Sequence, residues 1–349
     1  MVDYDEAQAI LSALAGTLPG PKTASIPLLQ ATGHILAKDL IAATARPEAD
    51  ISAMDGYAFC CADIPATGTQ SISLATREYI VAGNQPGPHC KGTAATILTG
   101  ARLPAGADCV IARERVTVRG NDIHLSRADA VVGKNIRRAG EEYPAGYSLL
   151  NAGQKLDWRH IGLLASQNVR QLAVYRPYRV GVLANGAEFA PDALDCRAEI
   201  NTPMLCSMLE SMGLHVLHRL VGSDSQTELR DAVSELAAQS DILITTGGIS
   251  VGQTDNVLPV MQQLGASCLF RRVQIRPGKP FTVMRLGETP VFCLPGNPGA
   301  AALCTQVFVL PFLRSVTGLK TQSRNSARPG RRSLFAYSSP AETTCLVPV

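Results

Sequence analysis

The stretch Asp241-Ile-Leu-Ile-Thr-Thr-Gly-Gly-Ile-Ser-Val-Gly252 decides the fold class of this chain. It begins as an apolar run of strand length and ends in a loop with three glycines around Ser250. Such a run, bounded by glycine, is typical of a strand buried on both faces. Because strands of this kind belong to parallel sheets covered by helices, we predict an α/β domain around it.

Alternating strand and helix patterns continue on both sides of that stretch. We predict strands at 179–184, 214–220, near Val273, at 281–284 and at 291–294, and helices at 202–213, 227–238, 256–264 and 297–312. Thr202 is expected to cap the first of these helices, with Pro203 at its first position. The alternation predicts a parallel, helix-covered α/β domain over residues 179–318.

The first half of the chain has a different composition. Residues 4–18 carry apolar side chains at helical spacing, and residues 26–151 are rich in Gly, Pro and Thr. Short β-prone runs within the second segment, at 71–74, 95–98, 109–111 and 115–118, predict small β-rich domains. We expect a linker domain from 1–45 and 146–178, a β-rich domain at 46–145, and a polar tail at 319–349.

Composition excludes several classes of protein. With 46% apolar and 17% charged residues, the chain is typical of a globular protein. A net charge of +3, with no basic stretch denser than paired arginines, disfavours nucleic-acid binding. The acidic N-terminus argues against a signal peptide, and the longest apolar run, 300–313, contains Pro311 and is too short for a bilayer. Ten dispersed cysteines without Cys-x-x-Cys spacing indicate reduced thiols in the cytoplasm.

Ligands of open parallel sheets bind beyond the carboxyl ends of the strands, and three loops of this domain follow such ends. They are 185–188, 246–252 and 294–299. In the second loop, Gly247, Gly248 and Gly252 permit close backbone approach to an anion, and Ser250 adds a hydroxyl donor. Taken alone, a tight turn between strand and helix is the commoner meaning of such glycines.

Two further segments carry features of phosphate sites. In Pro295-Gly296-Asn297-Pro298, Asn297 is suited to cap a helix and Pro298 to its first position, so the helix N-terminus can receive a phosphate. An ordinary capped helix explains this segment equally well. Arg276-Pro-Gly-Lys279-Pro places two cations around a rigid turn, with a solvated basic turn as the alternative.

Glu188 and Asp255 each follow a predicted strand end beside these loops. Mg²⁺ in proteins takes one or two carboxylates together with substrate phosphates. Either acid taken singly is more often a cap or a surface charge. Two acids that flank two candidate phosphate loops predict a metal-assisted phosphate site.

Six motifs resemble those of the MoeA and gephyrin E-domain family of molybdopterin molybdenumtransferases, and they follow one another along the chain as in that family. Three are the segments 246–255, 276–281 and 294–298. The other three are Ser52-Ala-Met-Asp-Gly-Tyr-Ala58, Leu98-Thr-Gly-Ala101 with Pro104-x-Gly-Ala-Asp108, and Asn135-Ile-Arg-Arg-Ala-Gly-Glu141. The resemblance extends to about Gly318, and the family's usual C-terminal β domain is expected to be absent.

The resemblance implies a MoeA-like multidomain fold with a Mog-like α/β domain. It also implies a reaction in which molybdate is inserted into adenylylated molybdopterin with the help of Mg²⁺, and AMP is released. The catalytic residues that it implies are Asp55, Glu142, Glu188, Asp255 and Lys279, and the metal ligands are Glu188 and Asp255. The cofactor-binding residues that it implies are Thr99, Arg137, Gly247, Gly248, Ser250, Gly252, Arg276, Pro295, Gly296, Asn297 and Pro298.

The partners implied by the resemblance are a second copy of the chain and, upstream in the pathway, a Mog-type molybdopterin adenylyltransferase. Asp55 is expected to face the active site from the partner subunit of the homodimer. No nucleic acid and no membrane is expected as a partner.

The chain departs from the family pattern at three positions. Ala187 stands where the family usually has an aspartate, Glu142 where an aspartate is usual, and Arg276 where a lysine is common. Two alternatives to an active enzyme therefore stay open. One is a molybdopterin- or molybdate-binding paralogue without catalysis. The other is a Mog-type or CinA-type nucleotide enzyme, which would leave 52–58 and 135–142 unexplained.

Overall fold

The apolar run before Gly247 forms strand β16 (Ile242–Thr246) inside a six-stranded sheet. The strand order of this sheet is β15-β14-β16-β20-β19-β17. The other strands are β14 Arg179–Asn185, β15 His215–Val221, β17 Ser267–Arg271, β19 Thr282–Leu286 and β20 Thr289–Leu294. As predicted, β14, β15, β16 and β20 run parallel to one another.

The predicted parallel pairing does not extend to one edge of the sheet. β19 pairs antiparallel with β20, and β17 pairs antiparallel with β19. Only Gly287, with φ of 57°, and Glu288 separate β19 from β20, and so short a turn joins antiparallel strands. The strand expected near Val273 lies earlier, in β17, and Val273 itself makes only an isolated parallel bridge to Val2.

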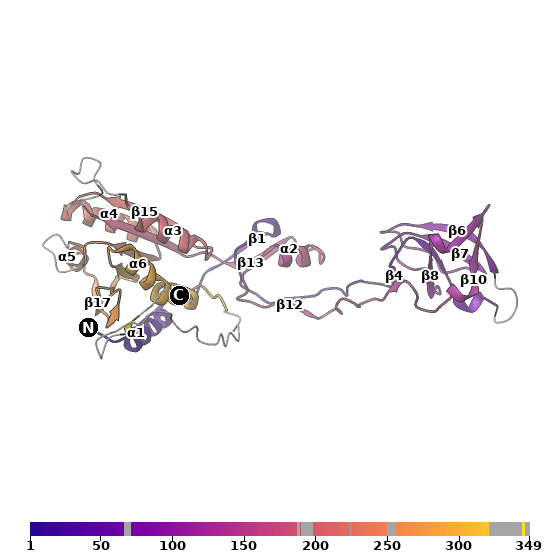
Figure 1. Ribbon diagram of the computed structural model, residues 1–349, viewed down its shortest axis with the longest axis horizontal. Helices are drawn as coiled ribbons and strands as arrows, with labels where there is room; N and C mark the ends of the chain where they lie inside the picture. The colour runs from indigo at the N-terminus through magenta and orange to yellow at the C-terminus, as the bar shows by residue number, and fades with distance from the viewer. Residues whose placement is uncertain are drawn as a thin grey trace. The chain divides into compact units, whose positions relative to one another are not determined.

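The structure is a computed structural model that describes residues 1–65, 71–186, 189, 198–223, 225–249, 256–320 and 344–345. It divides into two units, whose elements are labelled in Figure 1. We call Met1–Asp39 with Asn151–Val349 the α/β unit, and Leu40–Leu150 the β unit.

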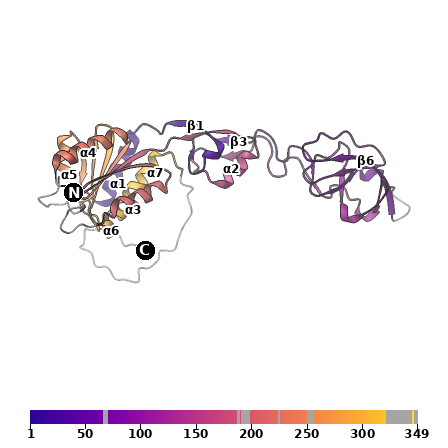
Figure 2. The same cartoon turned by 90° about the horizontal axis from the view of Figure 1, so that it is seen from above.

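Helices cover both faces of the six-stranded sheet, and Figure 2 shows this layering. On one face, Val180 and Val182 of β14 share an apolar cluster with α1, α3, α6 and α7. On the other, Leu183 of β14 shares a cluster with α4 and α5. The helices are α1 Tyr4–Thr17, α3 Asn201–Glu210, α4 Gln226–Gln239, α5 Val257–Gln263, α6 Pro298–Cys304, the π-helical η6 Thr305–Val309 and α7 Leu310–Val316. Alternate residues of one strand therefore face opposite helix layers, as a strand requires.

Two predictions about these helices need correction. Thr202 does not cap α3: the helix begins at Asn201, and the Glu199 carboxylate accepts the Thr202 backbone N–H at 3.0 Å. The final helix is longer than the predicted 297–312, because α6, η6 and α7 form one helix over Pro298–Val316. Its 19 residues suffice for a membrane span by length and composition, and 56% of it is buried inside the α/β unit.

A three-stranded antiparallel sheet, β1-β13-β2, also belongs to the α/β unit. Its strands are β1 Thr23–Pro27, β2 Ile35–Leu36 and β13 Gln171–Tyr175, and the nearby helices are the 3-10 helix η1 Leu28–Gln30 and α2 Trp158–Ala165. Helix α2 starts with a capping box, in which the Asp157 carboxylate accepts the backbone N–H groups of Arg159 and His160. Thr344 and Cys345 of the expected tail form β21, which pairs in parallel with β18 (Ile275–Arg276).

The β unit is built on a second six-stranded sheet with the order β8-β5-β7-β6-β10-β9. Its strands are β5 Gly56–Phe59, β6 Ser71–Ile80, β7 Thr93–Ile97, β8 Cys109–Ala112, β9 Val116–Arg119 and β10 Asp122–Ser126. Short ladders join β4 (Ile51–Ser52) to β11 (Ile136–Arg137) and β3 (Leu40–Ile41) to β12 (Ser148–Leu150). The four β-prone runs predicted in this region are the starts or cores of β6, β7, β8 and β9.

Candidate active site

The carboxyl ends of β14, β16 and β20 lie side by side at one edge of the α/β sheet. After β16 the chain turns through Gly247 and Gly248, whose φ angles are 87° and 62°. A Cβ at Gly247 would lie 2.4 Å from the Asn185 carbonyl oxygen, and one at Gly248 would lie 2.9 Å from Val257 Cγ2. The packing of the loop therefore requires glycine at both positions, whether or not the loop also binds an anion.

The Asn201 side chain links this loop by hydrogen bonds to the segments beside it. From the start of α3, its Nδ2 donates to Thr246 Oγ1 at 2.7 Å and to the Gly296 carbonyl oxygen at 2.9 Å. The Thr246 hydroxyl donates in turn to the Pro295 carbonyl oxygen at 3.3 Å. One buried amide thus joins the end of β16 to the loop after β20.

Two buried oxygens at this edge are left without a donor. Asn185 and Asn201 are 4% and 5% exposed, and their Oδ1 atoms have no hydrogen-bond partner among the described residues. An unsatisfied buried acceptor costs about 1–3 kcal/mol, so such atoms point to a missing donor or cation. Sequence reasoning did not single out either side chain. The available signal was Asn185 itself, an amide at the end of an otherwise apolar strand.

The loop after β20 forms the helix start that the sequence predicted. Asn297 Oδ1 accepts the Ala300 backbone N–H at 3.1 Å, and Pro298 is the first residue of α6. A Cβ at Gly296 would lie 3.5 Å from the Gly247 Cα, so the two predicted phosphate loops adjoin. Pro295 is buried, while Gly296 and Asn297 are exposed. The helix N-terminus, a favourable place for an anion, therefore opens at this edge.

The basic turn packs against the same helix. Gly278, with φ of 116°, has no room for a Cβ, which would lie 2.6 Å from Cys304 Sγ in α6. The Arg276 and Lys279 side chains are exposed and make no ion pair with the residues that the structure describes. The backbone of the turn is thus fixed, and its two cations remain available to an anion.

In the β unit, Asp55 and Thr99 form a compact pair. Asp55 Oδ1 accepts the Thr99 backbone N–H at 2.8 Å and the Thr99 hydroxyl at 2.7 Å. The backbone hydrogen bond from Thr99 is the main reason why the pKa of Asp55 is lowered, with the hydroxyl and nearby Arg113 adding to it. The pair is exposed, so it presents a fixed anionic carboxylate at the surface.

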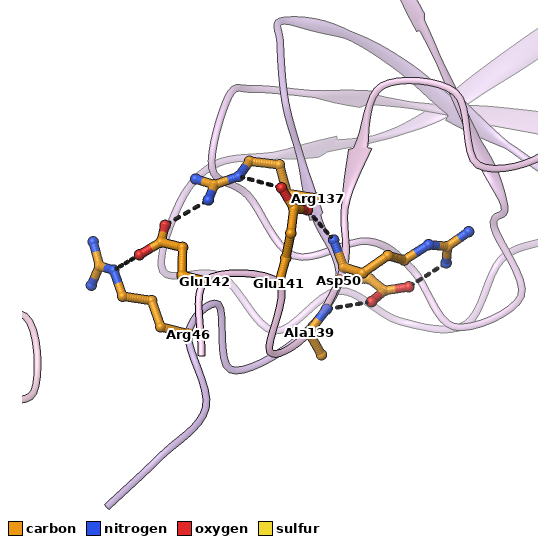
Figure 3. Close-up of polar contacts among 7 residues, drawn as sticks. Arg46, Asp50, Arg137, Ala139, Glu141 and Glu142 are labelled. Carbon is orange, nitrogen blue, oxygen red and sulfur yellow. Dashed lines mark hydrogen bonds and ion pairs between the residues drawn. The ribbon is translucent and has the colours of Figure 1, made fainter. Parts of the chain in front are cut away.

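A second charged group in the β unit surrounds Glu142 (Figure 3). The Glu142 carboxylate lies between two guanidinium groups, with Oε1 2.5 Å from Arg137 Nη2 and Oε2 2.8 Å from Arg46 Nε. The hydrogen bond from Arg137 is the largest cause of the lowered pKa of Glu142, and it raises the pKa of Arg137. Glu142 is therefore an ionised side chain that orients Arg137 rather than a free base.

Asp50 supports the same segment from the other side. It accepts the Arg138 side chain at 2.6 Å and the Ala139 backbone N–H at 2.9 Å, which together lower its pKa against the effect of burial, the largest single influence. Figure 3 shows both groups on adjoining loops. The loop that carries Arg137 and Glu142 is thus held at several points.

The predicted site residues therefore fall into two groups. One is Gly247, Gly248, Arg276, Lys279 and residues 295–298 of the α/β unit; the other is Asp55, Thr99, Arg137 and Glu142 of the β unit. The remaining predicted residues, Glu188, Ser250, Gly252 and Asp255, lie outside the described residues, as does Ala187. Within the described ranges, no three His, Cys, Asp or Glu side chains are grouped to hold a metal ion.

Two family models match the chain. Residues 2–167 match the model of the MoeA N-terminal region (domain I and II), and residues 181–315 match the model of a probable molybdopterin binding domain. Together they cover the β unit and nearly all of the six-stranded α/β sheet, while β13 lies between the two matched ranges.

Named relatives match most of this chain and about 70–80% of their own length. A molybdopterin molybdenumtransferase of a Nostoc species is 33% identical over 306 residues, which cover 85% of this chain and 70% of that protein. One of Haemophilus influenzae is 32% identical over 327 residues, covering 92% and 79%. The crystal structure of a molybdopterin biosynthesis MoeA protein from Pyrococcus horikoshii aligns with a TM-score of 0.78 at 25% identity, covering 91% of this chain and 81% of that one. The predicted MoeA-like multidomain fold is confirmed.

Proposed function

The chain belongs to the MoeA family of molybdopterin molybdenumtransferases, and from this we propose that it inserts molybdate into adenylylated molybdopterin and releases AMP. The family predicted from the six motifs is confirmed. The observation that carries the proposal is the edge formed by Gly247, Gly248 and Gly296, where a helix start opens beside buried oxygens that have no donor among the described residues. A Mog-type or CinA-type enzyme would leave the match of residues 2–167 without a purpose.

The proposed reaction requires the protein to neutralise charge more than to form a covalent bond with the substrate. Cleavage of a phosphate anhydride develops charge on phosphate oxygens, and fixed donors and cations stabilise it. The N-terminus of α6, capped by Asn297, supplies backbone N–H groups, and Lys279 and Arg276 supply positive charge. Because the Gly278 turn is held against Cys304, the two cations are presented on a fixed backbone.

We also propose that Mg²⁺ assists at this edge, held by Glu188 and Asp255. The chain fits an ion with oxygen ligands, since the Oδ1 atoms of Asn185 and Asn201 are buried acceptors without donors among the described residues. When bound, Mg²⁺ neutralises charge on the phosphates. The residues of the chain then orient the nucleotide end and exclude water from the anhydride.

The β unit's contribution is proposed to come from a second copy of the chain. In this homodimer, Asp55 and Thr99 of one copy complete the site at the Gly247 loop of the other, with Arg137, oriented by Glu142, beside them. Two large exposed side chains of the small sheet region, Leu29 at 86% and Trp158 at 78%, support an interface between copies.

The decisive assay measures AMP release from adenylylated molybdopterin in the presence of molybdate and Mg²⁺. We expect release that requires molybdate and that falls at least tenfold in Lys279→Ala, since a charge-assisted contact to phosphate is worth about 1.5–3 kcal/mol. Lys38→Ala, at another exposed lysine, is the control. Tight binding without release would select the non-catalytic paralogue, and absence of both would reject the proposal.

The arrangement of the site across two copies has its own test. Asp55→Asn and Lys279→Ala chains, each inactive alone, are mixed after dissociation. If Asp55 acts in trans, each mixed dimer has one site with both native residues, and a statistical mixture regains about a quarter of the wild-type activity. No recovery in a mixture shown to contain mixed dimers would place the two residues in the same copy.

Three further expectations remain proposals. We propose the domain division 1–45 with 146–178, 46–145 and 179–318, with a Mog-type adenylyltransferase as the upstream source of the substrate. We also propose a cytoplasmic location. In its support, the eight described cysteines between Cys60 and Cys304 are unpaired, and burial raises the pKa of the Cys293 and Cys304 thiols to about 12.

A further inference from the structure

The α/β unit contains a cavity of about 440 Å³ at the amino ends of its parallel strands. It is lined by the segment after α1, the segment before β14, and the starts of β16 and β20. The candidate active site lies at the opposite ends of the same strands, beyond Asn185 and Thr246. The volume is within the range of about 300–1,000 Å³ that is typical of small-molecule sites.

The charges around this cavity favour an anion. Lys22 and Arg176 line it, and neither makes an ion pair with the described residues. The two acids of the lining are already engaged: Asp241 holds Arg179 at 3.2 Å, and Glu288 pairs with Arg285. Two cations therefore remain without a counter-charge among the described residues. One is the planar Arg176 guanidinium, which can bind an anion through two N–H groups, and the other is the compact Lys22 ammonium.

Part of the remaining lining is apolar. Leu18, Pro19, Pro21 and Pro177 supply apolar surface, and the Tyr178 hydroxyl donates to the Pro19 carbonyl oxygen at 3.1 Å. Ser240 is 5% exposed, and its hydroxyl has no hydrogen-bond partner among the described residues. This hydroxyl lies against Gly181 of β14, where a Cβ would come within 2.6 Å of it, so it packs onto the sheet and is not counted as a ligand contact.

We propose that this cavity, which we call the amino-edge cavity, is a second ligand site that binds a small organic phosphate monoester. The dianion meets Lys22 and Arg176, and the organic group lies against the prolines. The site is independent of the proposed transferase reaction, because it uses none of the residues assigned to that reaction.

The probe is 4-fluorophenyl phosphate, whose binding to the full chain is followed by fluorine NMR. Gly20 lines the cavity, and a Cβ there has nothing within 4 Å, so Gly20→Asp adds an opposing charge without a clash. We expect Gly20→Asp and Lys22→Gln/Arg176→Gln each to weaken binding by about tenfold or more. The control Lys38→Gln/Arg170→Gln removes the same charge at exposed positions outside the cavity, and we expect a change below about twofold.

A Lys279→Gln variant separates the two candidate sites, since binding at the amino-edge cavity persists in it. Loss in Lys279→Gln with retention in Gly20→Asp would assign the probe to the other edge and overturn the proposal. Equal loss in the charge control, or no binding to the wild type at millimolar probe, also overturns it. The cavity could instead be part of an interface between two copies of the chain. Sedimentation of Gly20→Asp tests this alternative, because conversion of a dimer to a monomer would identify the cavity as an interface and overturn the proposal. Fluorophenol and fluorobenzoate, run in parallel, should bind more weakly than the phosphate.

Discussion

The two groups of predicted site residues are held in place by different physics. At the edge of the α/β sheet, positions are dictated by backbone: Gly247 and Gly278 have no room for a Cβ, and the buried Asn201 joins three segments. In the β unit, Asp55 and Glu142 are exposed carboxylates fixed by hydrogen bonds and ion pairs. The packed backbone positions of the first group hold the fold as well as the proposed site, whereas the side chains of the second can be altered with little effect on folding.

This difference predicts how the two groups respond to mutation. Buried, tightly packed positions carry large costs when their shape changes, while exposed ion pairs contribute about 0–1 kcal/mol. Loss of function at the buried, tightly packed positions of the sheet edge should therefore come with loss of stability. In the β unit the two should separate.

The largest effect is expected for Gly247→Ala. The new Cβ would meet the Asn185 carbonyl oxygen at 2.4 Å in a backbone with φ of 87°, so strain and overlap together should lower the free energy of unfolding by about 2–5 kcal/mol. Gly33→Ala is a matched control, because Gly33 has φ of 85° and nothing within 4 Å. Urea denaturation measures both variants. Equal losses would show that the contact with Asn185 costs nothing and that the comparison fails.

A smaller loss is expected when the Asn201 amide is removed. Asn201→Ala leaves both the Gly296 carbonyl oxygen and Thr246 Oγ1 without the donor that Asn201 supplies, at a cost of about 1–3 kcal/mol. A double-mutant cycle with Thr246→Val isolates the side-chain pair, and we expect a coupling energy of about 1 kcal/mol. Additive losses would mean that the two side chains do not act together.

In the β unit, Glu142→Gln should separate activity from stability. The variant removes the charge that orients Arg137, so we expect AMP release to fall about tenfold while the free energy of unfolding changes by less than about 1 kcal/mol. Arg115→Gln breaks another ion pair of the same unit, with Asp129, and should leave both quantities nearly unchanged. A stability loss at Glu142 comparable with that of Gly247→Ala would remove the distinction between the two groups.

These contrasts also explain what the sequence could predict. Periodicity located the strands around β16 and the Asn297 cap because both depend on nearby residues. The antiparallel placement of β17 and β19 was missed because an apolar run does not record its direction. The contact of the Glu199 carboxylate with the Thr202 backbone N–H depends on how the chain enters α3.

The same limit applies to the candidate site: local patterns predicted its loops but not its buried side-chain contacts. The loops that adjoin at Gly247 and Gly296 were found from glycine and proline patterns, which report backbone geometry. The roles of Asn185 and Asn201 depend on burial and on partners far along the chain, at Thr246 and Gly296, and no local pattern carries that information. The amino-edge cavity is hidden for the same reason, since its lining comes from four separate segments.

The smallest effect concerns the cap of α2, the partly exposed Asp157 carboxylate, which belongs to neither group of site residues. Hydrogen bonding to Arg159, the largest cause, lowers the pKa of Asp157 from 3.8 to about 2. Because the folded pKa lies below the unfolded value, the charge of Asp157 stabilises the fold above about pH 4, and this contribution is lost as pH falls toward 2. Asp157→Asn keeps a good capping side chain and removes only the charge. We therefore expect a slightly lower melting temperature than wild type at pH 7 and 5, with a difference that shrinks between pH 4 and 3. Thermal melts of both proteins across this range measure it, and a difference that is constant with pH would mean that the cap acts through its shape alone.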